Sequence, residues 1–336
     1  MAWYLDNCSS FDIMVPLMLE IARENHPGIS WDIVCLDAAG HGRSDYEPSG
    51  NYLLHRHVHD VFKVVQRLNF TRPHLLGHSM GASILSVLSG TFPSLPASLT
   101  FLDNYGPLAL PDPDVPSNLR SYIEAHERAS RKARFPTVDH AITVRSDAKA
   151  LISVSPDAAR ILCERGLVEV RDDETGATTY SWSSDAKLMV PHAVYLCSTE
   201  AATESFLKAI QCPVRMIAGT ESFYRSEQRR ERVEGRIKLL AQSLGPAKFQ
   251  HHLIDGTHHL HLEGTDSPRR TSVEYNALRH YGGPKCELEE YERTERKTWL
   301  RVLMRGRIQF ESKREGKRCK GRGATLFAPI KTNQFL

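Results

Sequence analysis

The chain has 336 residues, 41% of them hydrophobic and 25% charged, which is typical of a globular protein with room for one large α/β domain or two smaller ones. There is no apolar run of about 18 residues, and the N-terminus has no basic segment followed by an apolar stretch. Neither a membrane span nor a secretory signal is therefore expected. The net charge of +3 is uneven, because residues 265–336 carry 17 Lys and Arg against 9 Asp and Glu.

That basic excess belongs to a C-terminal tail with runs of charge and no regular succession of strands and helices. Clustered Lys and Arg can bind nucleic acid or an acidic partner. A solvated, poorly ordered extension is the simpler interpretation, so we expect no nucleic-acid partner, and the oligomeric state is left open.

The seven cysteines are odd in number, scattered, and form no Cys-x-x-Cys pair. Some lie in apolar runs, as Cys35 does. This usage is typical of reduced, buried thiols in an intracellular protein, and we expect a cytoplasmic one.

In chain order, the first part alternates helices and strands. The expected helices are residues 10–25, 53–68 and 81–92, and the expected strands are residues 31–37, 73–76 and 98–103. The strands are short apolar runs, and the first is rich in β-branched residues. This alternation predicts a parallel sheet with helices on both faces.

The alternation stops between residues 107 and 209. Four prolines between residues 107 and 116 indicate a connection, polar helices are expected at 117–133 and 157–166, and residues 168–171 and 179–182 read as a hairpin. The α/β pattern returns with a strand at 214–218, a helix at 224–244 and a strand at 249–254. We therefore predict a core of residues 1–106 and 210–264, a lid of residues 107–209, and the tail.

Residues 77–81 read Gly-His-Ser-Met-Gly and lie between an expected strand and an expected helix. In this setting the serine occupies a sharp, strained turn that lifts its hydroxyl clear of the sheet. The N-terminus of the following helix favours negative charge at the same place. Ser79 is therefore the predicted nucleophile.

A serine nucleophile needs a base, an acid that orients the base, and donors for the oxyanion. His258 is the preferred base, because it follows the last expected strand in a Gly-Thr-His turn; His259 and His261 are competitors. The acid should follow the strand at 214–218, which makes Glu221 the first choice. The alternative is Asp103, at the end of the strand after the nucleophile helix.

The backbone N–H of Met80 is the first expected oxyanion donor, since it directly follows the serine. The second donor should come from a loop near the N-terminus. A metal site on the histidines is the weaker interpretation, because no Cys or carboxylate lies at ligand spacing. We expect no metal and no cofactor.

These motifs resemble the α/β-hydrolase superfamily, and more narrowly its serine hydrolase-like branch, from about Leu5 to Glu263. The resemblance rests on four motifs and a lid segment: residues 5–12, 37–44, 77–81, 256–258 and 180–185. It implies a mostly parallel sheet with an inserted helical lid and a triad in the order serine, acid, histidine. Epoxide hydrolases and dehalogenases of the superfamily use aspartate as nucleophile, so Ser79 argues against both.

The chain also departs from this family. A His-Gly dipeptide that supplies the second oxyanion donor is absent, and Tyr4 falls where that donor is expected. The family's first three strands would precede residue 1, and the third normally separates the strands at 31–37 and 73–76. We therefore expect an N-terminally truncated core in which those two strands lack their shared neighbour, and a chain that is unstable when expressed alone.

The function expected from this site is hydrolysis of a small carboxylic ester or related acyl compound through an acyl-serine intermediate. The alternative is a catalytically impaired or inactive hydrolase-like binding or scaffold protein, owing to the missing strands and the missing His-Gly loop. Substrate identity is not encoded in these motifs.

Overall fold

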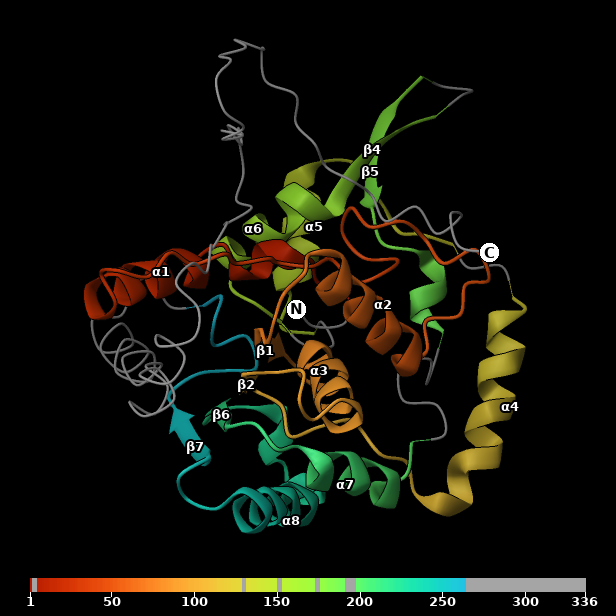
Figure 1. The fold of residues 1–336 in the computed structure, drawn as a ribbon. Helices are drawn as coiled ribbons and strands as arrows, with labels where there is room; N and C mark the ends of the chain where they lie inside the picture. Colours follow the sequence, from red (N-terminus) through yellow and green to blue (C-terminus); the bar gives the residue numbers. More distant parts are fainter. Residues whose placement is uncertain (2–4, 129–130, 150–152, 173–175, 191–197, 264–336) are drawn as a thin grey trace.

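The computed structural model describes residues 1, 5–128, 131–149, 153–172, 176–190 and 198–263 (Figure 1). Its centre is a sheet of four parallel strands in the order β1-β2-β6-β7. The strands are β1 His74–His78, β2 Ser98–Leu102, β6 Val214–Gly219 and β7 Phe249–Ile254. All four agree with expected strands, so the predicted parallel sheet is confirmed.

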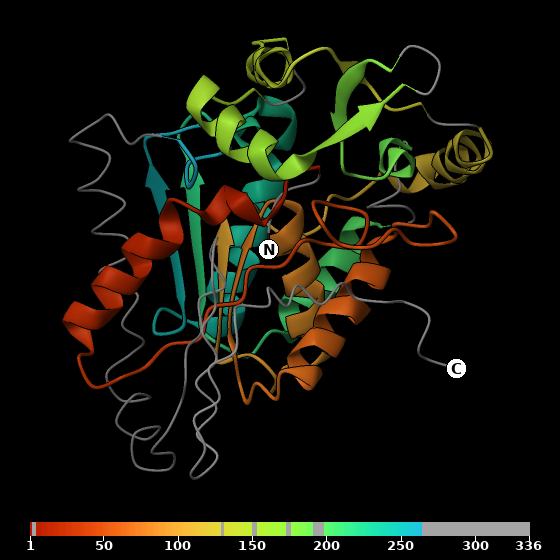
Figure 2. The same cartoon turned by 90° about the horizontal axis from the view of Figure 1, so that it is seen from above.

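Helices cover both faces of this sheet (Figures 1 and 2). On one face lie α2 Leu54–Arg67, α3 Met80–Thr91, α7 Glu200–Ala209 and α8 Glu227–Leu244, and on the other lie η1 Cys8–Phe11 and α1 Met14–Asn25. Side chains of a strand alternate between the two faces. Leu75 accordingly packs with the first group of helices, and Leu76 with the second.

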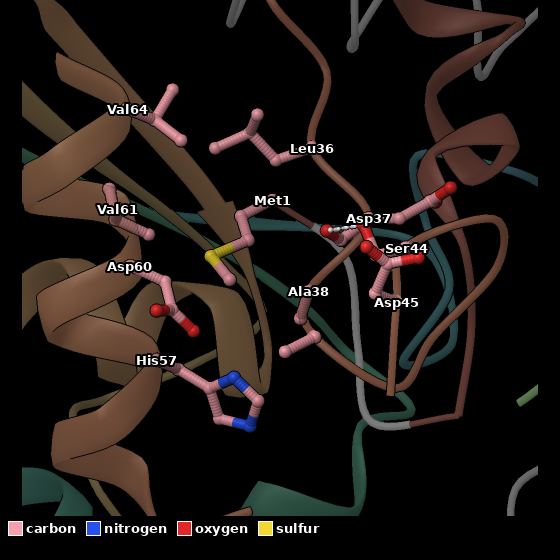
Figure 3. Close-up of a pocket in the computed structure, with 11 residues that line it drawn as sticks. Met1, Leu36, Asp37, Ala38, Ser44, Asp45, His57, Asp60, Val61 and Val64 are labelled. Carbon is pink, nitrogen blue, oxygen red and sulfur yellow. Dashed lines mark hydrogen bonds between the residues drawn. The ribbon is translucent and has the colours of Figure 1, made fainter. Parts of the chain in front are cut away.

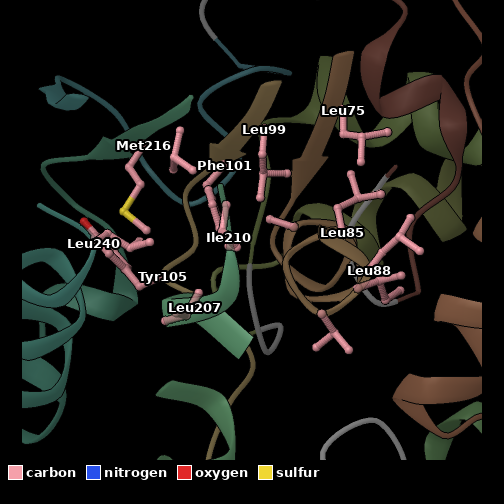
Figure 4. Close-up of a cluster of buried hydrophobic side chains, with 14 of the residues drawn as sticks. Leu75, Leu85, Leu88, Leu99, Phe101, Tyr105, Leu207, Ile210, Met216 and Leu240 are labelled. Carbon is pink, nitrogen blue, oxygen red and sulfur yellow. The ribbon is translucent and has the colours of Figure 1, made fainter. Parts of the chain in front are cut away.

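The larger core lies under α2, α3, α7 and α8 (Figure 4). Leu99, Phe101 and Met216 from the sheet meet Leu88 of α3 and Leu240 of α8 there, and all five are fully buried. Burial of each such side chain contributes about 1.5–3 kcal/mol. This core fixes β1 and α3, and therefore the turn between them.

The strand expected at residues 31–37 is wrong: this segment has no regular secondary structure. A strand exists only through backbone hydrogen bonds to a neighbouring strand. The edge of β1 that residues 31–37 would need is bonded to Met1 instead. The Met1 amino group donates to the Leu76 carbonyl, and the Met1 carbonyl accepts from the His78 N–H. Leu36 instead lines a small cavity with Met1 and Val61 (Figure 3).

Between β2 and β6 the chain builds a second, antiparallel sheet in the order β3-β5-β4. We call residues 112–190 the cap segment; it lies beyond the carboxyl ends of the four parallel strands (Figure 2). It contains η2 Asp112–Asp114, α4 Val115–His126, β3 Arg134–Phe135, α5 Val138–Ser146, α6 Pro156–Gly166, β4 Leu167–Arg171, β5 Thr178–Trp182 and η3 Ala186–Met189. The expected hairpin is confirmed as β4 and β5.

The domain division stays a prediction. The helix α7, which falls inside the predicted lid, contributes Leu207 to the larger core beside α3, so it packs with the sheet rather than with the cap segment. The predicted tail at 265–336 lies outside the described residues.

Candidate active site

Ser79 lies between β1 and α3 with φ +48° and ψ −117°. This backbone conformation is strained for a residue with a side chain, and strain of this kind is found at functional sites. Space is equally tight around Gly77, because a Cβ there would lie 2.4 Å from the Ala82 nitrogen and 2.5 Å from the Gly81 carbonyl carbon. The sequence folds this way because only glycine lets the strand and helix approach so closely.

His258 lies in the turn after β7 and is 3% exposed. Its Nδ1 lies 2.5 Å from Asp103 Oδ2, and Asp103 is fully buried at the end of β2. The carboxylate also accepts hydrogen bonds from the Gly219 N–H (2.9 Å) and the Ser222 hydroxyl (2.5 Å). Because a carboxylate accepts, Nδ1 carries the proton and Nε2 is left with the lone pair that a base needs.

Asp103, the alternative acid, is thus the carboxylate that the structure brings to His258. Glu221, the first choice, has an exposed side chain, and its backbone N–H donates to the Gly256 carbonyl. The preference for Glu221 fails because β6 ends at Gly219, where the chain turns beside Gly256 and Thr257; the Glu221 side chain points to solvent instead.

Two contacts hold the turn that carries His258. His78, the residue before Ser79, donates a hydrogen bond of 2.8 Å from Nε2 to the His258 carbonyl. Phe223 packs against the His258 ring with centroids 4.6 Å apart. The base turn and the nucleophile turn are therefore joined through adjacent residues.

Burial lowers the pKa of His258 below the usual histidine value, and the hydrogen bond that His258 donates to Asp103 opposes part of that effect. Burial also lowers the pKa of His78 and His261 well below the usual value. The imidazoles of His258, His78 and His261 are therefore neutral at neutral pH, as a general base must be.

The competing histidines His259 and His261, and also His251 on β7, have other surroundings. His259 pairs with Asp6, His261 packs on Phe11 with ring centroids 5.1 Å apart, and His251 lies on β7 with Nε2 3.3 Å from the Tyr105 hydroxyl. None of these three contacts involves Asp103.

Met80 is the first residue of α3, where a backbone N–H has no acceptor within its own helix. This agrees with a role as oxyanion donor, which stays a prediction. Tyr4, the other predicted donor, lies outside the described residues. Within the residues that the structure describes, no three His, Cys, Asp or Glu side chains are placed to hold a metal ion.

Sequence reasoning missed two ion pairs that join the cap segment to the core. Arg145 of α5 lies 3.1 Å from Asp6, and Arg165 of α6 lies 2.6 Å from Asp37. The motif at 37–44 explains how Asp37 is held for the second pair. Its carboxylate accepts hydrogen bonds from the Cys8 and Arg43 N–H groups. Gly42 (φ +51°) leaves room for that carboxylate, because a Cβ there would lie 2.4 Å from it. The one available signal was that Asp6 and Asp37 both lie in motifs of the family.

Comparison with known proteins agrees with this geometry. The sequence model of the α/β hydrolase fold family matches residues 7–147. A serine hydrolase-like protein of Dictyostelium discoideum is 28% identical over 279 residues, 81% of this chain and 72% of the relative. Human serine hydrolase-like protein 2 is 27% identical over 269 residues, 77% and 80% of the two chains.

The structure of a hypothetical protein from Pseudomonas aeruginosa PAO1 is also similar, with a TM-score of 0.67 and 28% identity over 83% of this chain and 89% of that one. The chain has the α/β-hydrolase fold, and its likeness to these proteins supports a hydrolase of the serine hydrolase-like branch. No helix in the part of the chain that the structure describes is long and apolar enough to cross a membrane.

Proposed function

We propose that this chain hydrolyses a small carboxylic ester or a related acyl compound through an acyl intermediate on Ser79, without a cofactor. The observation that carries the proposal is the buried pair of His258 and Asp103, whose Nδ1 and Oδ2 atoms lie 2.5 Å apart. It is joined to the turn of Ser79 by the hydrogen bond from His78 to the His258 carbonyl.

In the first half-reaction, the Ser79 hydroxyl oxygen attacks the acyl carbon while His258 Nε2 takes the hydroxyl proton. Asp103 stabilises the imidazolium that forms, and the N–H of Met80 donates to the oxyanion. The tetrahedral intermediate collapses by breaking the bond to the leaving oxygen, which receives the proton from His258. The acyl group stays on Ser79 and an alcohol departs.

In the second half-reaction, His258 takes a proton from water, and the resulting hydroxide attacks the acyl carbon. Collapse breaks the bond to Ser79 Oγ, which regains a proton from His258, and a carboxylic acid leaves. The enzyme returns to its starting protonation state, so each turnover consumes one ester and one water.

The alternative of a non-catalytic binding protein is less favoured, because a scaffold has no use for a strained serine turn that is joined through His78 to the turn of a buried acid–histidine pair. Labelling with a fluorophosphonate probe separates the two. Wild type should be labelled and Ser79→Ala should not. A folded wild type that is not labelled would contradict the proposal that this chain is an enzyme.

An intracellular location is also part of the proposal. Cys8, Cys35, Cys163 and Cys212 are free thiols, and burial raises the pKa of the first three. Such thiols suit a reducing compartment. Fractionation of cells that express the chain should find it with cytosolic markers.

A further inference from the structure

His259, the residue after the proposed base, has a buried acidic partner of its own. Its Nε2 lies 2.9 Å from Asp6 Oδ2, and the two side chains are 0% and 2% exposed. Because the carboxylate accepts, the His259 ring donates from Nε2. Asp6 lies 253 positions earlier, in the loop that leads into η1.

Asp6 is in turn held by the cap segment. The other carboxylate oxygen, Oδ1, lies 3.1 Å from a guanidinium nitrogen of Arg145 on α5. Burial alone would raise the pKa of Asp6, but the contacts with His259 and Arg145 keep it below its usual range. A buried carboxylate stays ionised only with such partners, so Arg145, Asp6 and His259 form one polar chain.

His259, at one end of this polar chain of side chains, is the direct neighbour of the proposed base, His258. The His259 carbonyl accepts hydrogen bonds from the Leu262 and Glu263 N–H groups, and the His258 carbonyl accepts one from His78. The peptide that links His258 to His259 therefore lies between two held groups: the His258 carbonyl is bonded to the His78 ring, and the His259 side chain is bonded to Asp6. A displacement of the His259 backbone would move this peptide and the His258 side chain with it.

We infer that the Arg145–Asp6–His259 chain positions the His258 imidazole, so that a side chain of the cap segment influences the chemical step without touching the substrate. The inference rests on the proposed function, since it takes His258 as the base. Arg145, Asp6 and His259 are positioning residues. Displacement of a reacting group by about 1 Å can cost about a hundredfold in rate.

The fold supplies a matched control in Arg165. It too is a cap-segment arginine on a buried core carboxylate, with side-chain exposures of 17% and 3% against 14% and 2% for Arg145 and Asp6. The Asp37 carboxylate also accepts hydrogen bonds from the Cys8 and Arg43 N–H groups, so it holds the start of η1 two residues from Asp6, but it bonds to neither Asp6 nor His259 in the described structure. Loss of Arg165 should therefore loosen the cap segment without freeing His259.

The experiment compares the rate constant of fluorophosphonate labelling in wild type, Arg145→Met and Arg165→Met, with thermal unfolding measured on each. We expect Arg145→Met to slow labelling by about tenfold or more, and Arg165→Met to stay within about twofold of wild type. Equal slowing of both variants, or no slowing in Arg145→Met, would overturn the inference.

His259 gives a second, independent comparison. Gln places an amide N–H near the position of Nε2, so His259→Gln should keep most of the rate that His259→Phe loses. With p-nitrophenyl acetate, His259→Phe should lower kcat and leave KM nearly unchanged. The double variant of His259→Phe with Arg145→Met should have a kcat no lower than that of His259→Phe alone, because both substitutions interrupt the same Arg145–Asp6–His259 contacts.

The outcomes separate the two levels of the account. An unlabelled but folded wild type overturns the proposed function and this inference together. A labelled wild type whose Arg145→Met variant reacts at the same rate overturns the inference alone. If His259→Phe does not fold, the comparison of the two arginine variants still decides.

Discussion

At Asp103 three donors meet one buried carboxylate: the ring of His258, the hydroxyl of Ser222 and the backbone N–H of Gly219. These bonds keep the His258 ring in the tautomer whose Nε2 can accept a proton. Glu221 is only two residues past Gly219 but points to solvent. The assignment of the acid therefore depends on where β6 ends.

We predict that Asp103→Asn lowers kcat for p-nitrophenyl acetate by about a thousandfold or more, since an amide can hold the wrong tautomer, as in other triads. Glu221→Gln is the matched control and should change kcat by less than about twofold, within the range of a surface substitution. A large loss in Glu221→Gln with a small one in Asp103→Asn would restore the first choice of acid.

The pH dependence follows from the surroundings of His258. Burial lowers its pKa below the usual 6.5, and the base must be neutral to act. The rate should therefore be constant through neutral pH and fall with acidification only at a pH below 6.5. The measurement is kcat/KM against pH with p-nitrophenyl acetate; an acidic limb centred above 6.5 would contradict the assigned base.

How far the site could be predicted differs between residues. The positions of Ser79 and His258 were predictable because a turn motif and a strand end place each of them locally. The carboxylate that contacts His258 was not, because the sequence does not show which of two neighbouring strand ends turns toward the histidine. The partner of His259 was hidden for a similar reason: Asp6 and Arg145 are 139 positions apart and meet only when the cap segment packs on the core.

At the scale of the elements, the turn between β1 and α3 is the most constrained part of the fold. Ser79 has positive φ, and Gly77 lies within van der Waals contact of the first turn of α3. The two elements then share the core beneath α3, so a shift at the turn reaches the whole helix.

We predict that Gly77→Ala is severely destabilising, by about 3 kcal/mol or more, because its Cβ would meet backbone atoms that cannot yield. Gly235→Ala is the matched control: nothing lies within 4 Å of its Cβ on α8, so it should stabilise by about 0.5–1 kcal/mol. Urea unfolding measures both. A Gly77→Ala variant as stable as wild type would show that the turn is wider than described.

The strands of the four-stranded parallel sheet were predictable from apolar runs and turn residues, and the segment at 31–37 shows the limit of this reasoning. Its β-branched sequence suits a strand, but a strand also needs a partner with free N–H and C=O groups. In the described structure Met1 bonds to β1 on that edge. Propensity is local, whereas pairing is decided by the rest of the fold.

At the scale of the whole molecule, the cap segment is joined to the core by buried polar contacts. Besides the two ion pairs, the Tyr52 hydroxyl donates to Asp185 (2.6 Å) and the Asn7 amide donates to the Leu162 carbonyl (3.0 Å). Such contacts are costly to break on one side, because the remaining partner stays buried and unpaired.

We predict that Arg165→Met lowers the free energy of unfolding by about 3 kcal/mol at neutral pH. Burial alone would raise the pKa of Asp37, but the bonds from Arg165, Arg43 and Cys8 hold it below the usual value. The stabilisation is therefore present above the usual carboxyl pKa and is lost as the pH falls through the lower folded value. Urea unfolding at neutral and acidic pH should show the difference from wild type shrinking in acid; a constant difference would contradict this.

The most direct test of the central claim is the mass of the protein after rapid mixing with p-nitrophenyl acetate and quenching in acid. The account predicts that wild type gains one acetyl group, that peptide mapping places it on Ser79, and that Ser79→Ala gains none there. A folded wild type that turns over the ester with no adduct on Ser79, or with the adduct on another residue, would contradict the claim that Ser79 is the nucleophile.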